Sequence, residues 1–345
     1  MFVVKPVTRF FLKLGILALP LAVALLGYVI CDPFMVLRSY RSYNADHGVE
    51  LNRDFVSTQV YLNQAEAYGY DSFIFGNSRS LAFLTGDWSL HLDSKAVFHF
   101  DARLETLYGV AGKMRLLDRK GAPIRHVLLV LDSNLLSGTT DREGLLYMKH
   151  PAVSGHTYAF HAMCLKTYLT HTFLFPYLAT KTTGITLAGF LDPATRSKVV
   201  STQVANDVLL VELDRRIAAN EDAYYTQMAS VFGDPQSRVE SVDAPAIGKE
   251  SLALLREIRA IGWKHHADVR IAISPLYDQA RLNPADLALL KELFGAENVH
   301  DFSGANEFTS EVRNYYETSH YRPHVGRQLM DHIYARALTA NAPQR

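Results

Sequence analysis

Two short segments of the sequence combine residue types that could perform nucleophilic chemistry. The first, residues 76–80 (GNSRS), directly follows a short apolar run, and the second, residues 316–323, places Glu317 three residues before His320. A serine at a strand-to-helix turn exposes its hydroxyl and offers its own amide to an oxyanion. Such a serine needs a base, and a histidine with a carboxylate nearby is the usual solution. The two segments therefore indicate one Ser/His site containing Ser78 and His320.

Each segment also has a simpler explanation when it is taken alone. Gly-Asn-Ser-Arg is a common turn sequence, and Glu-x-x-His spans a single helical turn. Their order along the chain, one after the first expected strand and the other near the C-terminus, favours a shared site. Arg79 has two open interpretations, since it either holds an anionic substrate or pairs with a carboxylate.

The elements that must position these residues are predicted from apolar runs and helical spacing. Short apolar runs bounded by turn formers are typical of buried parallel strands, and apolar spacing at three and four residues is typical of helices. The expected strands are 72–75, 96–100, 126–131, 269–273 and 299–302, and the expected helices are 79–90, 104–119, 247–262 and 284–295. This alternation predicts an α/β fold with a doubly wound, mostly parallel sheet.

Polar residues directly follow three of the expected strands. They are Asn77 and Ser78 after the first, Asp132 and Asn134 after the central one, and Ser274 after a later one. Ligands bind outside the carboxyl ends of the strands in such sheets. Asn77, Arg79, Asp132 and Asn134 are therefore the further candidates for holding an oxyanion or a substrate.

The region 140–245 interrupts the strand–helix pattern and is expected to be a helical insertion. Residues 156–187 are rich in aromatic residues and threonine, and residues 205–230 have a charged, helical pattern. The insertion is interpreted as a lid, a membrane-facing element or a partner-facing element. The 14 histidines show no metal-binding spacing, so no metal and no cofactor is expected.

The N-terminus predicts a membrane anchor. Residues 14–31 contain no charged residue, and about 20 such residues in a helix span the ~30 Å core of a bilayer. Lys5, Arg9 and Lys13 precede this run without any acidic residue, which places the N-terminus in the cytoplasm. The alternatives are a cleaved signal peptide and a lipid-modified Cys31, but no small-residue cleavage site precedes Asp32.

The predicted organisation follows from these segments. It comprises a cytoplasmic tail (1–9), a transmembrane signal anchor (10–31), a juxtamembrane segment (32–69), an α/β domain (70–335) and a flexible C-terminal tail (336–345). A bacterial inner-membrane protein with a periplasmic or extracellular main domain is expected. The 345 residues include 35 basic and 35 acidic ones, and this zero formal charge argues against nucleic-acid binding. Two cysteines indicate no disulfide framework.

The Ser78 and His320 segments resemble the blocks of the SGNH/GDSL hydrolase superfamily. In that family the nucleophile follows the first strand and an Asp-x-x-His block lies near the C-terminus. Residues 76–79 (GNSR), 32–34 (DPF) and 319–323 (SHYRP) are similar to membrane-anchored members associated with acylation of cell-surface polysaccharide or teichoic acid. The resemblance implies that Ser78 is the nucleophile, His320 its general base, and Glu317 the residue that orients the imidazole in place of the family's aspartate.

The chain departs from the family pattern at the oxyanion donors. Residues 101–103 (DAR) stand where the family has a glycine, and Asn134 is only a candidate for the family's asparagine. The resemblance implies an extracytoplasmic esterase or O-acyltransferase that acts on a cell-envelope glycan through an acyl-enzyme. Its expected partners are the glycan or acyl donor, a membrane-bound O-acyltransferase and the lipid bilayer. The departures leave open a non-catalytic accessory protein that binds a membrane acyltransferase or a polysaccharide.

Overall fold

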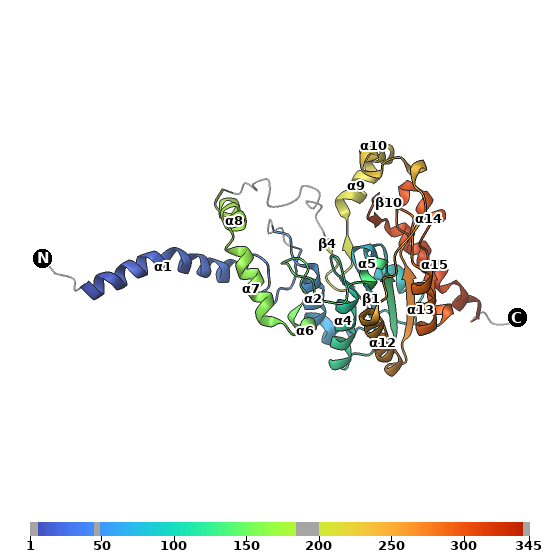
Figure 1. Cartoon of the computed structure of the whole chain (residues 1–345), viewed down its shortest axis with the longest axis horizontal. Coiled ribbons are helices and arrows are strands. Elements are labelled where there is room, and N and C mark those ends of the chain that lie inside the picture. The colour runs from blue at the N-terminus through green and yellow to red at the C-terminus, as the bar shows by residue number, and fades with distance from the viewer. Residues whose placement is uncertain (1–5, 45–48, 184–199, 341–345) are drawn as a thin grey trace.

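The protein consists of one long N-terminal helix and a body in which helices surround a central sheet (Figure 1). The structure is a computed structural model that describes residues 6–44, 49–183 and 200–340. The N-terminal helix, α1 (Pro6–Cys31), projects away from the body. The candidate site residues all belong to the body.

The central sheet has five strands in the order β2-β1-β3-β7-β9, and every neighbouring pair is parallel. The strands are β1 (Ser72–Gly76), β2 (Val97–Asp101), β3 (His126–Leu131), β7 (Asp268–Ile273) and β9 (Val299–Asp301). The predicted α/β class and the mostly parallel sheet are therefore confirmed. Because parallel strands end at the same edge, the residues that follow β1, β3 and β7 come together there.

Apolar side chains alternate between the two faces of this sheet, so that each face has its own core. Phe73 and Phe75 of β1 pack on one face with α2, α4, α12 and α13, whereas Ile74 packs on the other face with α3 and α15. The bounds of these helices are Arg53–Tyr68 (α2), Thr85–Trp88 (α3), Leu107–Arg119 (α4), Lys249–Lys264 (α12), Pro284–Phe294 (α13) and Pro323–Ala340 (α15). Helices thus cover both faces, which explains why β1 and β3 are almost entirely apolar.

Shorter elements connect these layers and lie at their margins. The helices are α5 (Ser133–Leu136), α6 (Pro151–Ser154), α7 (Thr157–Tyr168), α8 (His171–Thr183), α9 (Val211–Ala219), α10 (Glu221–Gln227), α11 (Ala229–Phe232) and α14 (Glu307–Ser310). The 3₁₀ turns are η1 (Ser78–Ala82), η2 (Pro235–Ser237), η3 (Ala296–Asn298) and η4 (Val312–Asn314). Three strand pairs lie outside the main sheet: β4 (Val200–Ser201) with β5 (Val208–Leu209), β6 (Ser241–Val242) with β8 (Ala280–Arg281), and β10 (Tyr315–Glu317) with β11 (His320–Tyr321).

Two predicted helices differ from the structure. Residues 79–90 form η1 and α3 instead of one helix, because the side chains of Asn77 and Ser80 bond to nearby backbone and hold a tight turn. The predicted helical stretch 205–230 begins with the strand β5, and the helices α9 and α10 follow it. Asn206 takes a left-handed conformation with φ 61°, which no helix allows.

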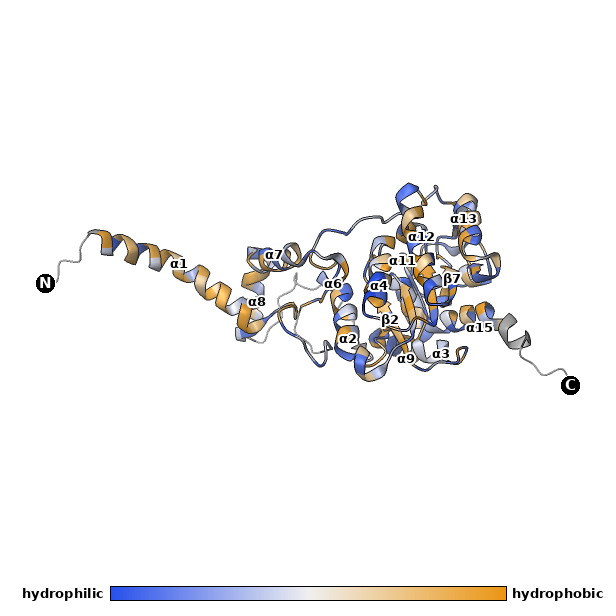
Figure 2. Ribbon diagram, turned by 90° about the horizontal axis from the view of Figure 1, so that it is seen from below, coloured by the Kyte–Doolittle hydropathy of each residue, from blue (hydrophilic) through white to orange (hydrophobic). Residues whose placement is uncertain are grey.

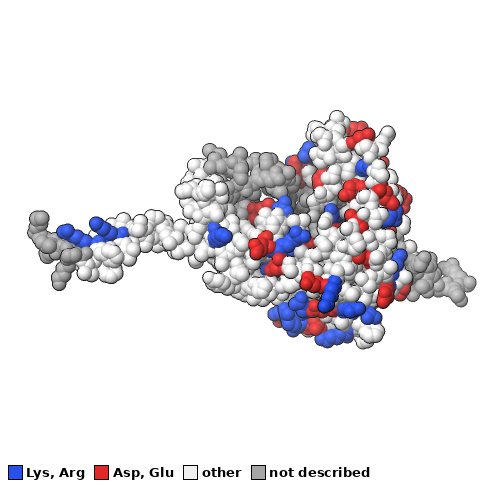
Figure 3. Space-filling model, in the orientation of Figure 1, with Lys and Arg blue, Asp and Glu red and all other residues white. Residues whose placement is uncertain are grey.

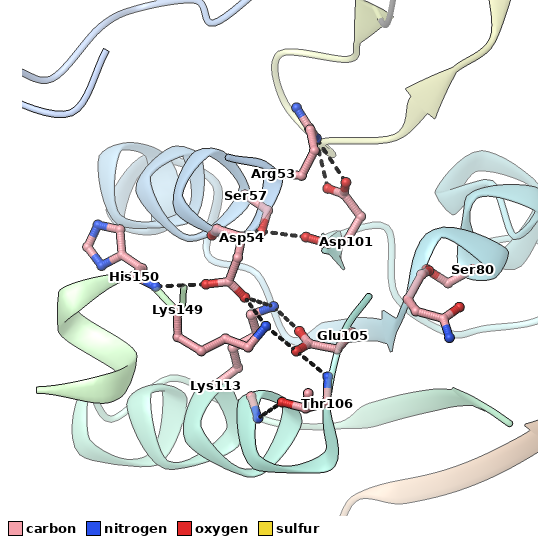
Figure 4. A network of polar contacts seen from close by, with 12 residues as sticks. Arg53, Asp54, Ser57, Ser80, Asp101, Glu105, Thr106, Lys113, Lys149 and His150 are labelled. Atoms are coloured by element: carbon pink, nitrogen blue, oxygen red, sulfur yellow. Dashed lines mark hydrogen bonds and ion pairs between the residues drawn. The ribbon is translucent and has the colours of Figure 1, made fainter. Parts of the chain in front are cut away.

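Helix α2 lies within the predicted juxtamembrane segment 32–69, yet it packs directly on the sheet. Its Val56, Val60 and Tyr61 belong to the same core as β1 and β2. Asp54 pairs with Lys113 of α4 at 2.7 Å, and both are fully buried (Figure 4). The α/β body therefore begins before residue 70. At the other end, α15 continues to Ala340, so residues 336–340 of the predicted flexible tail are helical, and residues 341–345 lie outside the described residues.

The buried charges that fasten α2 form a closed network (Figure 4). Glu105 accepts from Lys113 and lies 2.8 Å from the ammonium of Lys149. Burial opposes ionisation of Asp54, but the two lysines outweigh it and hold the pKa of that carboxyl below its usual range. Each buried charge thus has an opposite partner, as buried charges require.

Helix α1 is the one helix among the described residues that is long and apolar enough to cross a membrane. The stretch Val7–Cys31 has 25 residues and little of its apolar window is buried against the protein. Its surface carries Lys and Arg near the N-terminal end and none in the middle (Figure 3). The hydropathy colouring shows the same apolar stretch as an isolated rod outside the body (Figure 2).

Candidate active site

Ser78 is the first residue of η1 and stands at the carboxyl edge of the sheet, immediately beyond β1. Asn77 caps this turn, because its Oδ1 accepts the Arg79 N–H at 3.0 Å. Gly76 is required at the end of the strand, since a Cβ there would lie 2.7 Å from Ser80 Cβ and 3.0 Å from the carbonyl oxygen of Val130. The turn is therefore held tightly, and Ser78 is left half-buried at its start.

His320 and Glu317 reach Ser78 from a hairpin near the C-terminus. The Ser78 Oγ lies 2.8 Å from His320 Nε2, although the two residues are 242 positions apart. Glu317 Oε1 contacts His320 Nδ1, and its Oε2 accepts the Ser319 N–H at 2.7 Å. The antiparallel pair β10–β11 places Glu317 opposite His320, so the carboxylate contacts the ring nitrogen that faces away from Ser78.

The environment of Glu317 keeps its carboxyl ionised. Burial alone would raise the pKa, but the hydrogen bond and charge of His320 and the Ser319 amide outweigh burial, and the pKa of Glu317 lies below its usual value. An ionised Glu317 accepts a hydrogen bond from the Nδ1–H of His320, and this leaves Nε2 free to accept the Ser78 hydroxyl proton. The three residues are therefore arranged as nucleophile, base and orienting carboxylate.

Asn77, Arg79 and Asp132 are brought together beside Ser78 but bond to one another. Asp132 Oδ2 accepts from Asn77 Nδ2 at 2.5 Å and from Arg79 Nη1 at 2.6 Å. Its Oδ1 caps α5 by accepting the Leu135 N–H at 2.9 Å. Of the two interpretations of Arg79, the structure shows the carboxylate pair. These side chains join the end of β1 to the end of β3 and brace the Ser78 turn.

Asn134 is not gathered into this group. It is exposed on α5, and within the described residues its side chain makes no hydrogen bond. Asp101 at the end of β2 pairs with Arg53 at 2.8 Å and accepts from Asn206. The Ser78 N–H has no acceptor among the described residues and is therefore available to an oxyanion. Ser274, which follows β7, lies 3.3 Å from the hydroxyl of Tyr321, next to His320.

A small pocket of about 20 Å³ opens beside Ser78 and His320. Its walls are mostly apolar, and the Tyr316 hydroxyl donates to Asp214 at one side. The lining residues are Ser78, Leu81, Ala82, Val208, Leu209, Leu210, Asp214, Tyr316, His320, Tyr321 and Pro323. Sequence reasoning missed the wall formed by residues 208–210 and Asp214, which lie in the predicted insertion. No motif marks them, because only the tertiary fold brings them to Ser78.

A second Ser–His–acid group lies directly beneath the Ser78 turn and was also missed. Ser80 Oγ lies 2.8 Å from His99 Nε2, and His99 Nδ1 lies 3.4 Å from Asp207 Oδ1. Ser80 and His99 are fully buried. Asp207 also accepts from the Thr85 N–H and hydroxyl, so this group ties the turn, β2 and the pocket wall together.

The fold and site define a class: an α/β protein with a parallel sheet that presents a Ser–His–Glu constellation at the carboxyl edge of its strands. The residues that the structure describes contain no group of three or more metal-ligating side chains. No family model and no curated protein matches this chain.

Proposed function

We propose that this protein is a Ser/His-dependent esterase or O-acyltransferase, related to the SGNH hydrolases, that acts on a cell-envelope glycan. The observation that carries the proposal is the 2.8 Å contact between Ser78 Oγ and His320 Nε2, with Glu317 behind the imidazole. Both residues line a small surface pocket and are only partly buried. A buried structural contact between the same residue types would have no such access.

The reaction begins when Ser78 Oγ attacks the carbonyl carbon of an ester. Its proton passes to His320 Nε2, and the carbonyl oxygen becomes an oxyanion that the Ser78 N–H stabilises. His320 then gives the proton to the departing alcohol oxygen as the ester C–O bond breaks, which leaves an acyl group on Ser78. Glu317 stabilises the imidazolium through Nδ1.

The second half of the cycle repeats these steps with a new acceptor. His320 takes a proton from water or from a sugar hydroxyl, whose oxygen attacks the acyl-Ser78 carbonyl. The proton returns to Ser78 Oγ as the acyl–enzyme bond breaks. Water as acceptor releases a carboxylic acid, and a sugar hydroxyl yields an acylated glycan. Among the residues that the structure describes, the Ser78 N–H is the one donor that we assign to the oxyanion, so we expect slower turnover than at a site with two donors.

Helix α1 is proposed to anchor the protein in the bacterial inner membrane with its N-terminus in the cytoplasm. The support is its length, its apolar surface, and the Arg9 and Lys13 charges confined to its first half. The α/β body then lies in the periplasm or outside the cell, where envelope glycans are assembled. Reporter fusions at residue 345 test this orientation: a reporter active only outside the cytoplasm should be active.

A fluorophosphonate probe tests the catalytic proposal, because it phosphonylates serines only when they are activated. The full chain in detergent should be labelled at Ser78, and S78A should lose the label. S80A serves as the matched control, since Ser80 lies on the same turn and is fully buried. If the wild-type chain were unlabelled and released no acetate from an aryl acetate, the esterase proposal would be wrong.

The second candidate is a non-catalytic accessory protein that binds a membrane acyltransferase or a polysaccharide. It is favoured by the oxyanion site, where Asn134 faces solvent and Asp101 is committed to Arg53 and Asn206. This candidate predicts no probe labelling of Ser78 and retention of envelope acylation in cells that carry S78A. The same two experiments therefore separate the candidates.

A further inference from the structure

We propose that the helical hairpin α7–α8 lies on the membrane surface, with the outward face of α8 in the lipid headgroup region beside α1. This inference rests on the part of the proposed function that makes α1 a membrane anchor. It assigns a lipid surface to an apolar face that the fold of the chain leaves uncovered.

One face of the hairpin is fixed against the C-terminal end of α1 and the segment after it. The rings of Tyr28 and Tyr168 have centroids 5.1 Å apart, and those of Phe34 and Phe173 lie 4.8 Å apart. A Cβ on Gly27 would be 3.1 Å from the Tyr168 hydroxyl, so the two helices approach closely. The hairpin is therefore held at the last turn of α1.

This attachment sets the depth of the hairpin. Tyr28 is three residues from the end of α1, which corresponds to a rise of about 4.5 Å. The uncharged run of α1 ends at Cys31, where Arg38 donates to the carbonyl oxygens of Val29 and Ile30 at 2.7 and 2.6 Å. If α1 spans the bilayer, its last turn lies at the boundary between acyl chains and headgroups, and so does the hairpin. Figure 1 shows α8 beside this end of α1, running across its direction.

The opposite face of α8 is apolar and exposed. Phe173 and Tyr177, four residues apart, are buried against the protein, whereas Phe175 and Leu178 are 68% and 45% exposed. At 100° per residue these two pairs lie on opposite sides of the helix. A helix that is apolar on both sides is usually buried on both sides. Because the protein covers only one side of α8, we infer that lipid covers the other.

The charges of the hairpin fit an anionic lipid surface. Residues 157–183 contain Lys166 and Lys181 and no Asp or Glu. Aromatic residues gather at membrane interfaces, and basic side chains near the surface attract anionic headgroups. Docking would hold the α/β body at a set height above the membrane.

Brominated lipids test this placement, because bromine on an acyl chain quenches only tryptophans within contact range. The full chain carrying F175W is reconstituted in nanodiscs of phosphatidylethanolamine and phosphatidylglycerol, with and without brominated acyl chains. The native Trp88 is buried and Trp263 is 76% exposed on α12, and together they supply the background. V239W is the matched control, since Val239 is 80% exposed on the α/β body.

The added fluorescence of F175W should be quenched by the brominated lipid, and that of V239W should not. L178W reports the same face in case F175W folds poorly. If F175W and L178W were quenched no more than V239W, the proposal would be overturned, and a protein partner would be the remaining explanation for this apolar face. A chain that does not insert into nanodiscs would also overturn it. Fluorophosphonate labelling of Ser78 in the same samples reports the catalytic proposal separately.

Discussion

Ser78 and Ser80 stand two residues apart on one turn, and each places its hydroxyl 2.8 Å from the Nε2 of a histidine. Each histidine in turn has a carboxylate beside its Nδ1, Glu317 in one case and Asp207 in the other. The two groups differ in access. Ser78 lines a pocket, whereas Ser80 and His99 are fully buried beneath it.

They also differ in where the hydroxyl proton goes. Ser80 Oγ donates to the carbonyl oxygen of Asn77 at 2.8 Å, so its single proton is committed and His99 must donate to it. Within the described residues the Ser78 hydroxyl has only His320 as a partner, so its proton is directed at the base. Residue types alone therefore do not make a catalytic group. Two properties distinguish the nucleophile from the structural serine. One is whether a carbonyl oxygen already accepts the hydroxyl proton, and the other is whether the hydroxyl lines a pocket.

The largest expected effect separates the two serines directly. S78A should lower the rate of aryl acetate hydrolysis by about 10⁴-fold, because removing a nucleophile removes the covalent path. S80A should keep a rate within about tenfold of wild type, because Ser80 contacts the turn and the buried His99 and does not line the pocket. Initial rates of acetate release at saturating substrate measure both variants. Comparable losses in S78A and S80A would break the distinction between nucleophile and brace.

The next effect concerns the two carboxylates. E317Q should lower kcat by about 10²–10⁴-fold with a small change in KM, because an amide no longer stabilises the imidazolium during proton transfer. D207N should leave kcat nearly unchanged, since Asp207 acts on a histidine whose serine does not react. Steady-state kinetics of the two purified variants check this. A larger kcat loss in D207N than in E317Q would mean that the Asp207 group, and not the Glu317 group, has the catalytic role.

His99 should matter to stability more than to rate. H99A removes the donor to the Ser80 oxygen and the imidazole beside Asp207 and leaves a space in the buried core, which costs about 1–3 kcal/mol. The expected result is a lower midpoint of thermal unfolding with fluorophosphonate labelling of Ser78 retained at low temperature. H320A is the matched variant. It should lose labelling of Ser78, and its midpoint of thermal unfolding should lie closer to that of the wild type than the midpoint of H99A does. The reverse pattern would contradict the comparison.

Sequence patterns predicted the sheet well because its five strands are short apolar runs bounded by turn formers, and burial on both faces produces that pattern. The pairing of Ser78 with His320 followed from their places after the first strand and near the C-terminus. The sequence left Arg79 open between an anionic substrate and a carboxylate partner, because Asp132 is 53 residues away and only the parallel register brings the two together. The second group was missed for the same reason, since His99 and Asp207 are distant in sequence and resemble no local motif.

Helix α2 shows a different kind of miss. Its buried Val56, Val60 and Tyr61 follow helical spacing, but the polar residues between them and the nearby anchor led to its assignment to a juxtamembrane segment outside the α/β domain. The wall of the pocket, residues 208–210, was assigned to a helix because the charged stretch after it is helical. In both cases the local pattern was correct over part of the segment and tertiary packing decided the rest.

Glu317 also sets a pH dependence of stability. The pKa of Glu317 in the fold lies below its usual value of 4.5, so the unfolded chain binds more protons between the two values. The stability that ionised Glu317 contributes is fully present above pH 4.5 and is lost as the pH falls through the lower, folded value. The difference in unfolding midpoint between wild type and E317Q should be constant from pH 5 to pH 7 and shrink at more acidic pH. A difference that grew on acidification would contradict the ionised state of Glu317.

The smallest expected effect concerns Asn134, the residue that the SGNH resemblance offered as an oxyanion donor. Loss of such a donor costs about 10²–10³-fold in kcat. Asn134 is exposed on α5 and does not line the pocket that holds Ser78, so N134A should change kcat by less than about threefold. The Ser78 N–H would then carry the oxyanion without help from this side chain. A large loss in N134A would mean that substrate binding draws α5 toward the pocket. Ser78 would then differ from Ser80 in one more respect, an oxyanion donor that reaches the site only when substrate is bound.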